Sequence, residues 1–303
     1  MTLTVFGMHA AVADSTDQAK RIHDRIAGVP PDATTLTTMR DLIEPPNSDP
    51  LGAALLATQA PEFYSVTLKN FAAPWTNRDG SVFVPLDDYT ATVIGMIRDD
   101  MDFREVLSAD ILYIGSGSGI PAYSTSSNAH YEALEEQGVD LQANLTATTQ
   151  SAVTGIPSDA AAGVITSRSA AKAFFIDGTN RAMFRFTLLN HLCMDMEQVH
   201  DVTRVPDRIR QDVSRSPGGD SRVFLNNCIG CHNGMDPLAQ AFAYYDYEYD
   251  VVADPDAENG QLNYNAAGQF DPETGSRVEA KYYNNNLNFG LRASGPIYQG
   301  GRL

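Results

Sequence analysis

The chain has few cysteines and few basic residues. Only three cysteines occur in 303 residues, too few for the disulfide framework that stabilises many small secreted proteins. The 21 lysines and arginines are outnumbered by 38 aspartates and glutamates, so the formal net charge is -17. Because nucleic acid and anionic membrane surfaces repel such a protein, we expect neither as a partner.

Long apolar runs are also missing. No stretch approaches the ~20 apolar residues that a membrane-spanning helix needs, so we expect no membrane span. The hydrophobic fraction of 43% and the charged fraction of 19% are typical of a globular protein with a sizeable core. The length is sufficient for one large domain or two modest ones.

The most informative motif uses two of the three cysteines. Cys228 and Cys231 stand in the sequence CIGCH, with His232 directly after the second cysteine. This CxxCH spacing lets two thiols reach the vinyl groups of one haem and leaves the adjacent imidazole free to bind the iron. The sequence therefore predicts one covalent haem c, tethered by Cys228 and Cys231, with His232 as the proximal iron ligand.

Two other chemistries of a CxxC motif have less support. A structural zinc site would need two further Cys or His ligands at short spacing, and a thioredoxin-like redox pair would need a βαβ setting. The sequence has neither pattern. The third cysteine, Cys193, ends an apolar helical run in which it shares a face with Phe186 and Leu189. We predict that it is a small buried hydrophobe, with a redox role as a minor alternative.

The haem motif carries an expectation about the compartment. Haem is attached to CxxCH outside the bacterial cytoplasm, so we expect an exported protein in the periplasm or the extracellular space. The first residues end in an A-x-A pattern like that of a signal peptide, but they lack the basic segment that precedes one. Whether residues 1–13 belong to the mature chain stays open.

The helical spacing of apolar residues, interrupted by prolines and glycines, predicts a mainly α fold. An N-terminal helical domain, residues 1–175, is expected to cap a cytochrome c-like haem region, residues 176–303, which ends in an irregular tail containing β structure. The tail contains an alternating aromatic and acidic strand at 244–249 and is rich in asparagine and tyrosine. Predicted helices cover 14–27, 34–44, 51–59, 63–71, 87–98, 103–107, 130–137, 141–151 and 179–199.

The residues around the haem motif resemble a known family. Residues 228–246, CIGCHNGMDPLAQAFAYYD, are similar to the CxxCHxxMDPLGFALENFD signature of the planctomycete-type cytochrome c family, a group of exported monohaem proteins. Residues 102–110, 128–131, 162–167 and 188–193 resemble further segments of that family in the same order. The chain departs from the family in having Ala239 where the signature has glycine. It also has an Asn/Tyr-rich tail where the family has C-terminal helices. Any cysteine that pairs with Cys193 in that region of relatives is therefore absent.

The second axial ligand decides what a haem can do, because an open position admits peroxide or a small gas. Met235 is excluded because it follows His232 on the same side of the porphyrin. The remaining candidates are His130, His191, His200, Met194 and Met196, with His9 and His23 less favoured.

Among these candidates we predict His130 as the distal ligand. It occupies a His-Tyr position of the resembling family, and no local pattern gives it a packing role; a surface or capping histidine is the competing interpretation. His200 is the second choice, because Asp201 could orient its ring.

The functional expectation is one-electron transfer by an exported monohaem cytochrome with basic redox partner proteins. Two alternatives remain: a haem enzyme, such as a peroxidase or small-molecule oxidase with an open sixth site, and a structural cytochrome subunit of a larger assembly. Calcium is a further candidate ligand, at the acidic segment 254–260. However, its glycine stands one place late for an EF-hand, and a solvated loop is the favoured interpretation.

Overall fold

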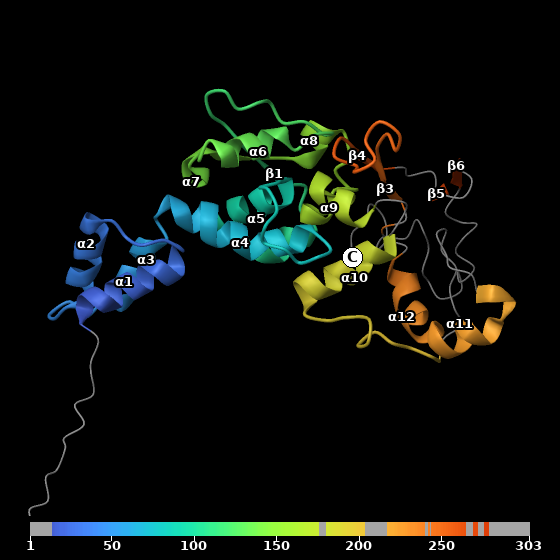
Figure 1. Cartoon of the computed structure of the whole chain (residues 1–303), viewed down its shortest axis with the longest axis horizontal. Coiled ribbons are helices and arrows are strands. Elements are labelled where there is room, and N and C mark those ends of the chain that lie inside the picture. Colours follow the sequence, from blue (N-terminus) through green and yellow to red (C-terminus); the bar gives the residue numbers. More distant parts are fainter. Residues whose placement is uncertain are drawn as a thin grey trace, which may run out of the picture. The chain divides into compact units, whose positions relative to one another are not determined.

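The computed structural model describes residues 14–175, 180–203, 217–239, 242, 244–264, 269–271 and 276–278 (Figure 1). The chain forms two compact units, which divide between Leu68 and Lys69. The boundary expected after residue 175 does not coincide with this division. Helix α9 (Arg168–Phe174) contacts α10 (Asn180–Leu192) and also two strands nearer the C-terminus, β3 (Tyr245–Glu248) and β4 (Gln261–Tyr264). Unit 2 therefore continues across residue 175.

Unit 1 is a small helical unit. Its helices are α1 (Ser15–Ile26), α2 (Ala33–Ile43) and α3 (Pro50–Ala57), followed by the π-helix η1 (Phe63–Leu68). Each α-helix begins after an aspartate whose side chain accepts a backbone N–H of the first turn, which is the expected N-cap chemistry. The helices pack around a core of small and flexible side chains: Ala19, Met39, Ala53 and Ala57.

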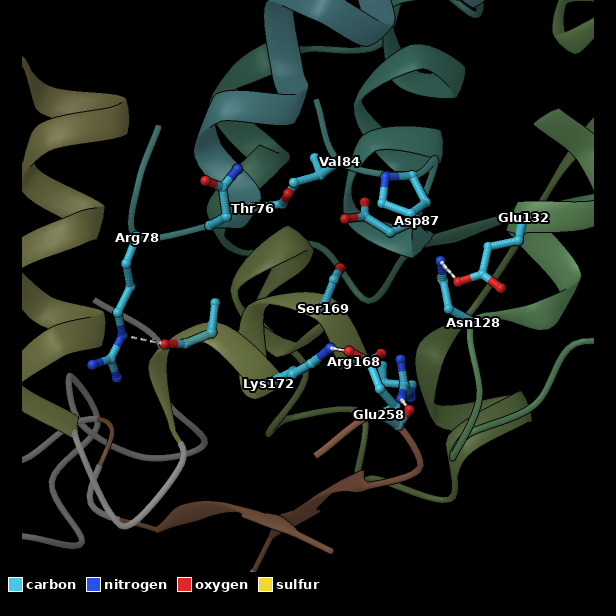
Figure 2. Close-up of a pocket in the computed structure, with 13 residues that line it drawn as sticks. Thr76, Arg78, Val84, Asp87, Asn128, Glu132, Arg168, Ser169, Lys172 and Glu258 are labelled. Carbon is cyan, nitrogen blue, oxygen red and sulfur yellow. Dashed lines mark hydrogen bonds and ion pairs between the residues drawn. The ribbon is translucent and has the colours of Figure 1, made fainter. Parts of the chain in front are cut away.

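Helix α5 (Asp88–Arg98) is the centre of unit 2. Its residues from Asp88 to Met96 are all buried, because α4 (Lys69–Ala72), α9 and the 3-10 turn η4 (Gly163–Thr166) contact it. Residues from the start of α5, from α6 (Ala129–Glu136) and from α9 line a cavity (Figure 2). Two further 3-10 turns, η2 (Ala73–Thr76) and η3 (Phe103–Leu107), complete this part of the unit.

The helix predicted over 141–151 is wrong. The structure divides these residues among α7 (Leu141–Asn144), β2 (Leu145–Thr148) and the start of α8 (Gln150–Thr154). Strand β2 pairs antiparallel with β1 (Leu112–Gly115), with Leu112 opposite Thr148. Pairing with a strand about thirty residues away therefore overrides the local helical pattern.

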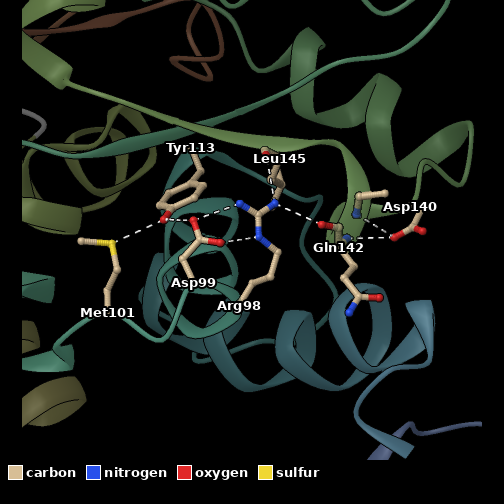
Figure 3. A network of polar contacts seen from close by, with 8 residues as sticks. Arg98, Asp99, Met101, Tyr113, Asp140, Gln142 and Leu145 are labelled. Atoms are coloured by element: carbon tan, nitrogen blue, oxygen red, sulfur yellow. Dashed lines mark hydrogen bonds and ion pairs between the residues drawn. The ribbon is translucent and has the colours of Figure 1, made fainter. Parts of the chain in front are cut away.

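A polar network holds this two-stranded sheet to the end of α5 (Figure 3). The Arg98 guanidinium donates to the carbonyl oxygens of Gln142 and Leu145, at 3.1 and 2.7 Å, and pairs with the Asp99 carboxylate. The Tyr113 hydroxyl donates to the other side of Asp99, at 2.6 Å. Because Arg98 satisfies carbonyls where α7 meets β2, the network fixes the position of this segment against α5.

The C-terminal part of unit 2 contains short helices and short strands. The 3-10 turn η6 (Pro217–Gly219) precedes α11 (Ser221–Asn227) and α12 (Ile229–Ala239). Two antiparallel pairs follow, β3 (Tyr245–Glu248) with β4 (Gln261–Tyr264) and β5 (Gln269–Asp271) with β6 (Ser276–Val278). The chain is thus mainly helical with small irregular sheets, which confirms the fold class at this coarse level. Across the described residues, no helix combines the length and apolar character needed to cross a bilayer.

Candidate functional site

The CxxCH motif lies at the junction of two short helices. Asp220 caps the start of α11 by accepting the Arg222 N–H, and Cys228 ends that helix. The chain turns helical again at once, since the His232 N–H donates to the Cys228 carbonyl at 3.1 Å. At ~100° per residue, Cys228, Cys231 and His232 fall within about 100° of arc on one face. We call this the attachment face.

A second face of α12, which carries Gly230 and Gly234, allows a close approach of another backbone segment. A Cβ atom on Gly234 would lie 1.7 Å from the Val199 carbonyl oxygen, and a Cβ on Gly230 would lie 1.8 Å from His200 Nε2. The Asp201 N–H donates to the Gly230 carbonyl at 3.0 Å. Only glycine leaves room for this contact. The segment 199–201 therefore lies against the face of α12 that carries Gly230 and Gly234, which adjoins Cys231 and points away from Cys228 and His232.

The donors on the attachment face fit the requirements of a tethered haem. Both thiols are free of disulfides and half-buried, so a porphyrin edge can reach them. The His232 ring is half-buried beside the buried Phe224, with 5.4 Å between ring centroids. Cysteine, cysteine and histidine on one helical face are the set that covalent haem attachment uses.

His130 lies elsewhere and is fully used by the fold. It is 2% exposed, and its Nε2 accepts the Gly115 N–H at 3.1 Å while its Nδ1 donates to the Pro121 carbonyl at 2.7 Å. Its helix, α6, and the CxxCH helix, α12, lie on opposite sides of unit 2 (Figure 1). With both ring nitrogens engaged, His130 has none to offer an iron, and we do not retain it as the distal ligand.

His200 is close to the motif but on the wrong face. Its exposed ring lies against Gly230, on the face of α12 that points away from Cys228 and His232. The neighbouring expectation for Cys193 is also wrong, because its side chain is exposed. Helix α10 ends at Leu192 and Cys193 takes a left-handed conformation, with φ 52°, which turns the side chain off the predicted apolar face.

His191 belongs to an aromatic cluster rather than to the motif. The Tyr89 hydroxyl and His191 Nε2 are 2.7 Å apart, and the Trp75 ring contacts the imidazole edge-on at 5.1 Å. Burial lowers the pKa of His191 to about 4, so its ring is neutral at pH 7. Burial also raises the pKa of Tyr89. The phenol therefore donates to the imidazole, and His191 is held by this bond.

Among the described residues, methionine is the candidate type that remains for the predicted second axial ligand. His23 is buried in unit 1, where its ring contacts the Val29 carbonyl, and His9 lies outside the described residues. Beyond Ala13, the residues that the structure does not describe include no histidine and no methionine. Met194 and Met196 are half-buried in the segment that joins α10 to Val199, next to α12.

Metal-ion sites of another kind find little support. Within the described ranges, no three His, Cys, Asp or Glu side chains converge to hold an ion. In the proposed calcium loop, Asp254 accepts the Asn259 N–H at 2.5 Å and Glu258 pairs with Lys172 at 2.5 Å. Asp254 therefore already has a backbone partner within its own loop, and the structure adds no support for calcium at this segment.

Sequence reasoning missed a second candidate site, the cavity beside α5, with a volume of about 480 Å³. Asp87 lines it and is only 7% exposed. Burial and the neighbouring Asp88 raise the pKa of Asp87 to about 7. Asp88 instead accepts the N–H groups of Arg168 and Ser169, which docks the start of α9 onto α5.

The only sequence signal for this cavity is the pair Asp87-Asp88 before an apolar helix, which predicts a helix cap and nothing more. The other side chains reach the cavity from segments far apart in the chain, so no linear motif marks it.

Comparisons of the chain with protein-family models, with curated proteins and with solved structures find no match.

Proposed function

We propose that this protein is an exported monohaem c-type cytochrome that transfers single electrons. The observation that carries the proposal is the CxxCH sequence at the junction of α11 and α12, where Cys228 caps the end of α11 and Cys231 and His232 lie in the first turn of α12. A bound haem c would supply an iron that cycles between two oxidation states. Its covalent attachment outside the cytoplasm supports a location in the periplasm or the extracellular space.

The residues of the chain would divide the work between tethering and orientation. Cys228 and Cys231 would form the thioethers, and His232 would bind the iron. Phe224 packs beside the His232 ring and limits its rotation. Gly230 and Gly234 let the segment 199–201 pack closely against α12. This support keeps the attachment face in a fixed direction, which an electron carrier needs for constant ligation.

The acidity of the chain supports a basic redox partner. With a formal net charge of -17, the protein attracts cationic surfaces over about 10 Å at 0.1 M ionic strength. Such attraction speeds the encounter of two proteins without requiring a tight complex. A docking partner with clustered lysines or arginines is therefore part of the proposal.

The central test is covalent haem. We expect the full chain, matured in a host that attaches haem c, to keep the mass of one haem after denaturation, because thioether bonds survive unfolding. Cys231→Ser should lose most of the attached haem, as measured by intact-protein mass spectrometry. Cys193→Ser is the matched control, since this exposed cysteine lies outside the motif, and it should keep full haem content. A correctly matured chain that releases all its haem into acidified acetone would contradict the proposal.

Coordination separates the electron carrier from a second candidate function. A haem enzyme with an open sixth site is favoured by one observation: His130 and His191 are engaged by hydrogen bonds elsewhere in the fold, and the ring of His200 lies against Gly230. If the protein is a carrier, we expect Met194 or Met196 as the second ligand, with low-spin iron and the weak near-infrared band of methionine ligation.

Two leucine substitutions, Met194→Leu and Met196→Leu, provide the measurement. Replacing the true ligand should abolish the near-infrared band and allow carbon monoxide to bind, while the other substitution should leave the spectrum unchanged. Met101→Leu serves as a control, because its sulfur accepts the Tyr113 hydroxyl within the fold. A wild-type protein that is high-spin and binds carbon monoxide rapidly would instead favour the enzyme.

A further inference from the structure

The cavity beside α5 is walled by side chains of both charge signs, and we call it the mixed-charge cavity. The side chains used here are Arg78, Asp87, Asn128, Glu132, Lys172 and Glu258. Figure 2 shows Arg78 on one side, with Asn128 and Glu132 opposite and Lys172 below. The volume of about 480 Å³ lies within the range of small-molecule sites.

One wall of the cavity carries carboxylates. Asp87 accepts the Thr90 N–H at 2.8 Å at the start of α5. Among the described residues, Asp87 has no ion pair with a basic side chain. Glu132 lies on the same wall and accepts a hydrogen bond from Asn128 Nδ2 at 3.2 Å. A buried carboxylate without a countercharge is costly, so a cationic group in the cavity would be stabilised here.

Another wall of the cavity carries a cation, Lys172, that a ligand can reach. Lys172 pairs with Glu258, but the two side chains are 31% and 59% exposed. An ion pair this exposed contributes little stability, so a ligand carboxylate can replace Glu258 at small cost. Arg78 is anchored through Nε, which donates to the Ala173 carbonyl at 2.6 Å. Arg78 also makes a further contact within the fold, so Lys172 is the cation that serves a ligand.

The wall between these two poles is rigid. Arg168 is 7% exposed, and its guanidinium donates to the Gly260 carbonyl at 2.9 Å and to the Tyr247 hydroxyl at 3.0 Å. These bonds tie the strands β3 and β4 to α9 and hold the loop with Glu258 at the cavity. The N–H groups of Arg168 and Ser169 also donate to Asp88, which fixes α9, with Lys172, against the start of α5, where Asp87 lies. The spacing of Lys172 from Asp87 is therefore held by hydrogen bonds, which favours a ligand of defined length.

We propose that the mixed-charge cavity binds a small zwitterion of the α-amino acid class, with its ammonium group at Asp87 and Glu132 and its carboxylate at Lys172. A ligand of one charge sign would meet repulsion from one of the two walls. The proposal does not depend on the haem, because none of these residues belongs to the CxxCH segment.

The first experiment measures thermal unfolding of the full chain in the presence of the genetically encoded L-amino acids, added one at a time. We expect at least one to raise the Tm by a few degrees, because a ligand that binds only the folded state stabilises it. The N-acetyl derivative of that amino acid lacks the ammonium group and its amide lacks the carboxylate, so neither should raise the Tm. If no amino acid changes the Tm, or if the amide acts as strongly as the free acid, the proposal is wrong.

Variants locate the site. Calorimetric titration with the amino acid found above should give a Kd raised about tenfold or more for Asp87→Asn and for Lys172→Gln, since each loses a charge-assisted contact. Lys20→Gln removes a comparable lysine that pairs with Asp24 in unit 1, and its Kd should equal that of the wild type. Lys172→Gln decides the assignment independently of Asp87, because an unchanged Kd for that variant would overturn it.

Discussion

Gly163→Ala is expected to remove most of the stability of unit 2. A Cβ atom at this position would lie 1.9 Å from the Val106 carbonyl oxygen and 2.5 Å from its carbon. These are backbone atoms, which cannot rotate away as a side chain can. Gly163 also has a φ of 54°, which other residues rarely adopt. We expect a loss of about 3–5 kcal/mol in the free energy of unfolding, which is a large part of a typical total.

The measurement uses the single tryptophan of the chain. Trp75 lies in unit 2, so its fluorescence in a urea titration reports the unfolding of that unit. Gly155→Ala is the matched control: its φ is 76°, but no atom lies within 4 Å of the position that a Cβ would take. It should therefore lose only about 1–2 kcal/mol, the cost of the left-handed backbone. Equal losses in the two variants would mean that the contact with Val106 is not rigid.

Local signals explain which helices the sequence predicts. Asp14, Asp32 and Asp87 each cap the helix that follows, and the apolar spacing behind them is local. The starts of α1, α2 and α5 accordingly lie within a residue or two of the prediction. The end of α10 could not be predicted in this way. It ends at Leu192 because the non-glycine residue Cys193 adopts a positive φ, which no sequence pattern marks.

The candidate site also has parts that local sequence predicts and parts that depend on distant contacts. The motif with Cys228, Cys231 and His232 is contiguous, so the face it occupies follows from helical geometry alone. The positions and partners of the His130 and His200 side chains depend on contacts with residues far away in the sequence. His130 is held by Gly115 and Pro121, and nothing in its immediate sequence indicates those two partners. The mixed-charge cavity is likewise assembled from distant segments, and only the placement of Asp87 before α5 can be predicted from the sequence.

Asp87→Asn is expected to make unit 2 more stable at neutral pH and less sensitive to pH. The pKa of Asp87 is about 7 in the folded chain, against an ordinary value of 3.8. Between these values the folded protein binds the proton and the unfolded protein releases it, so wild-type stability falls as pH rises from 4 to 7. The three-unit difference corresponds to at most about 4 kcal/mol. Asparagine keeps an acceptor for the Thr90 N–H but carries no charge.

Urea titrations followed by Trp75 fluorescence from pH 4 to pH 8 provide the test. At each pH, the free energy of unfolding of the wild type is subtracted from that of the variant. The difference is needed because His191, with a folded pKa of about 4, titrates in the same range with the opposite sign. The gain of Asp87→Asn should be largest above pH 7 and vanish near pH 4. Asp102→Asn is the control, because the Arg104 side chain lowers the pKa of Asp102 to about 2, outside the range tested. A gain for Asp87→Asn that does not change with pH would show that packing, and not the buried charge, separates the two proteins.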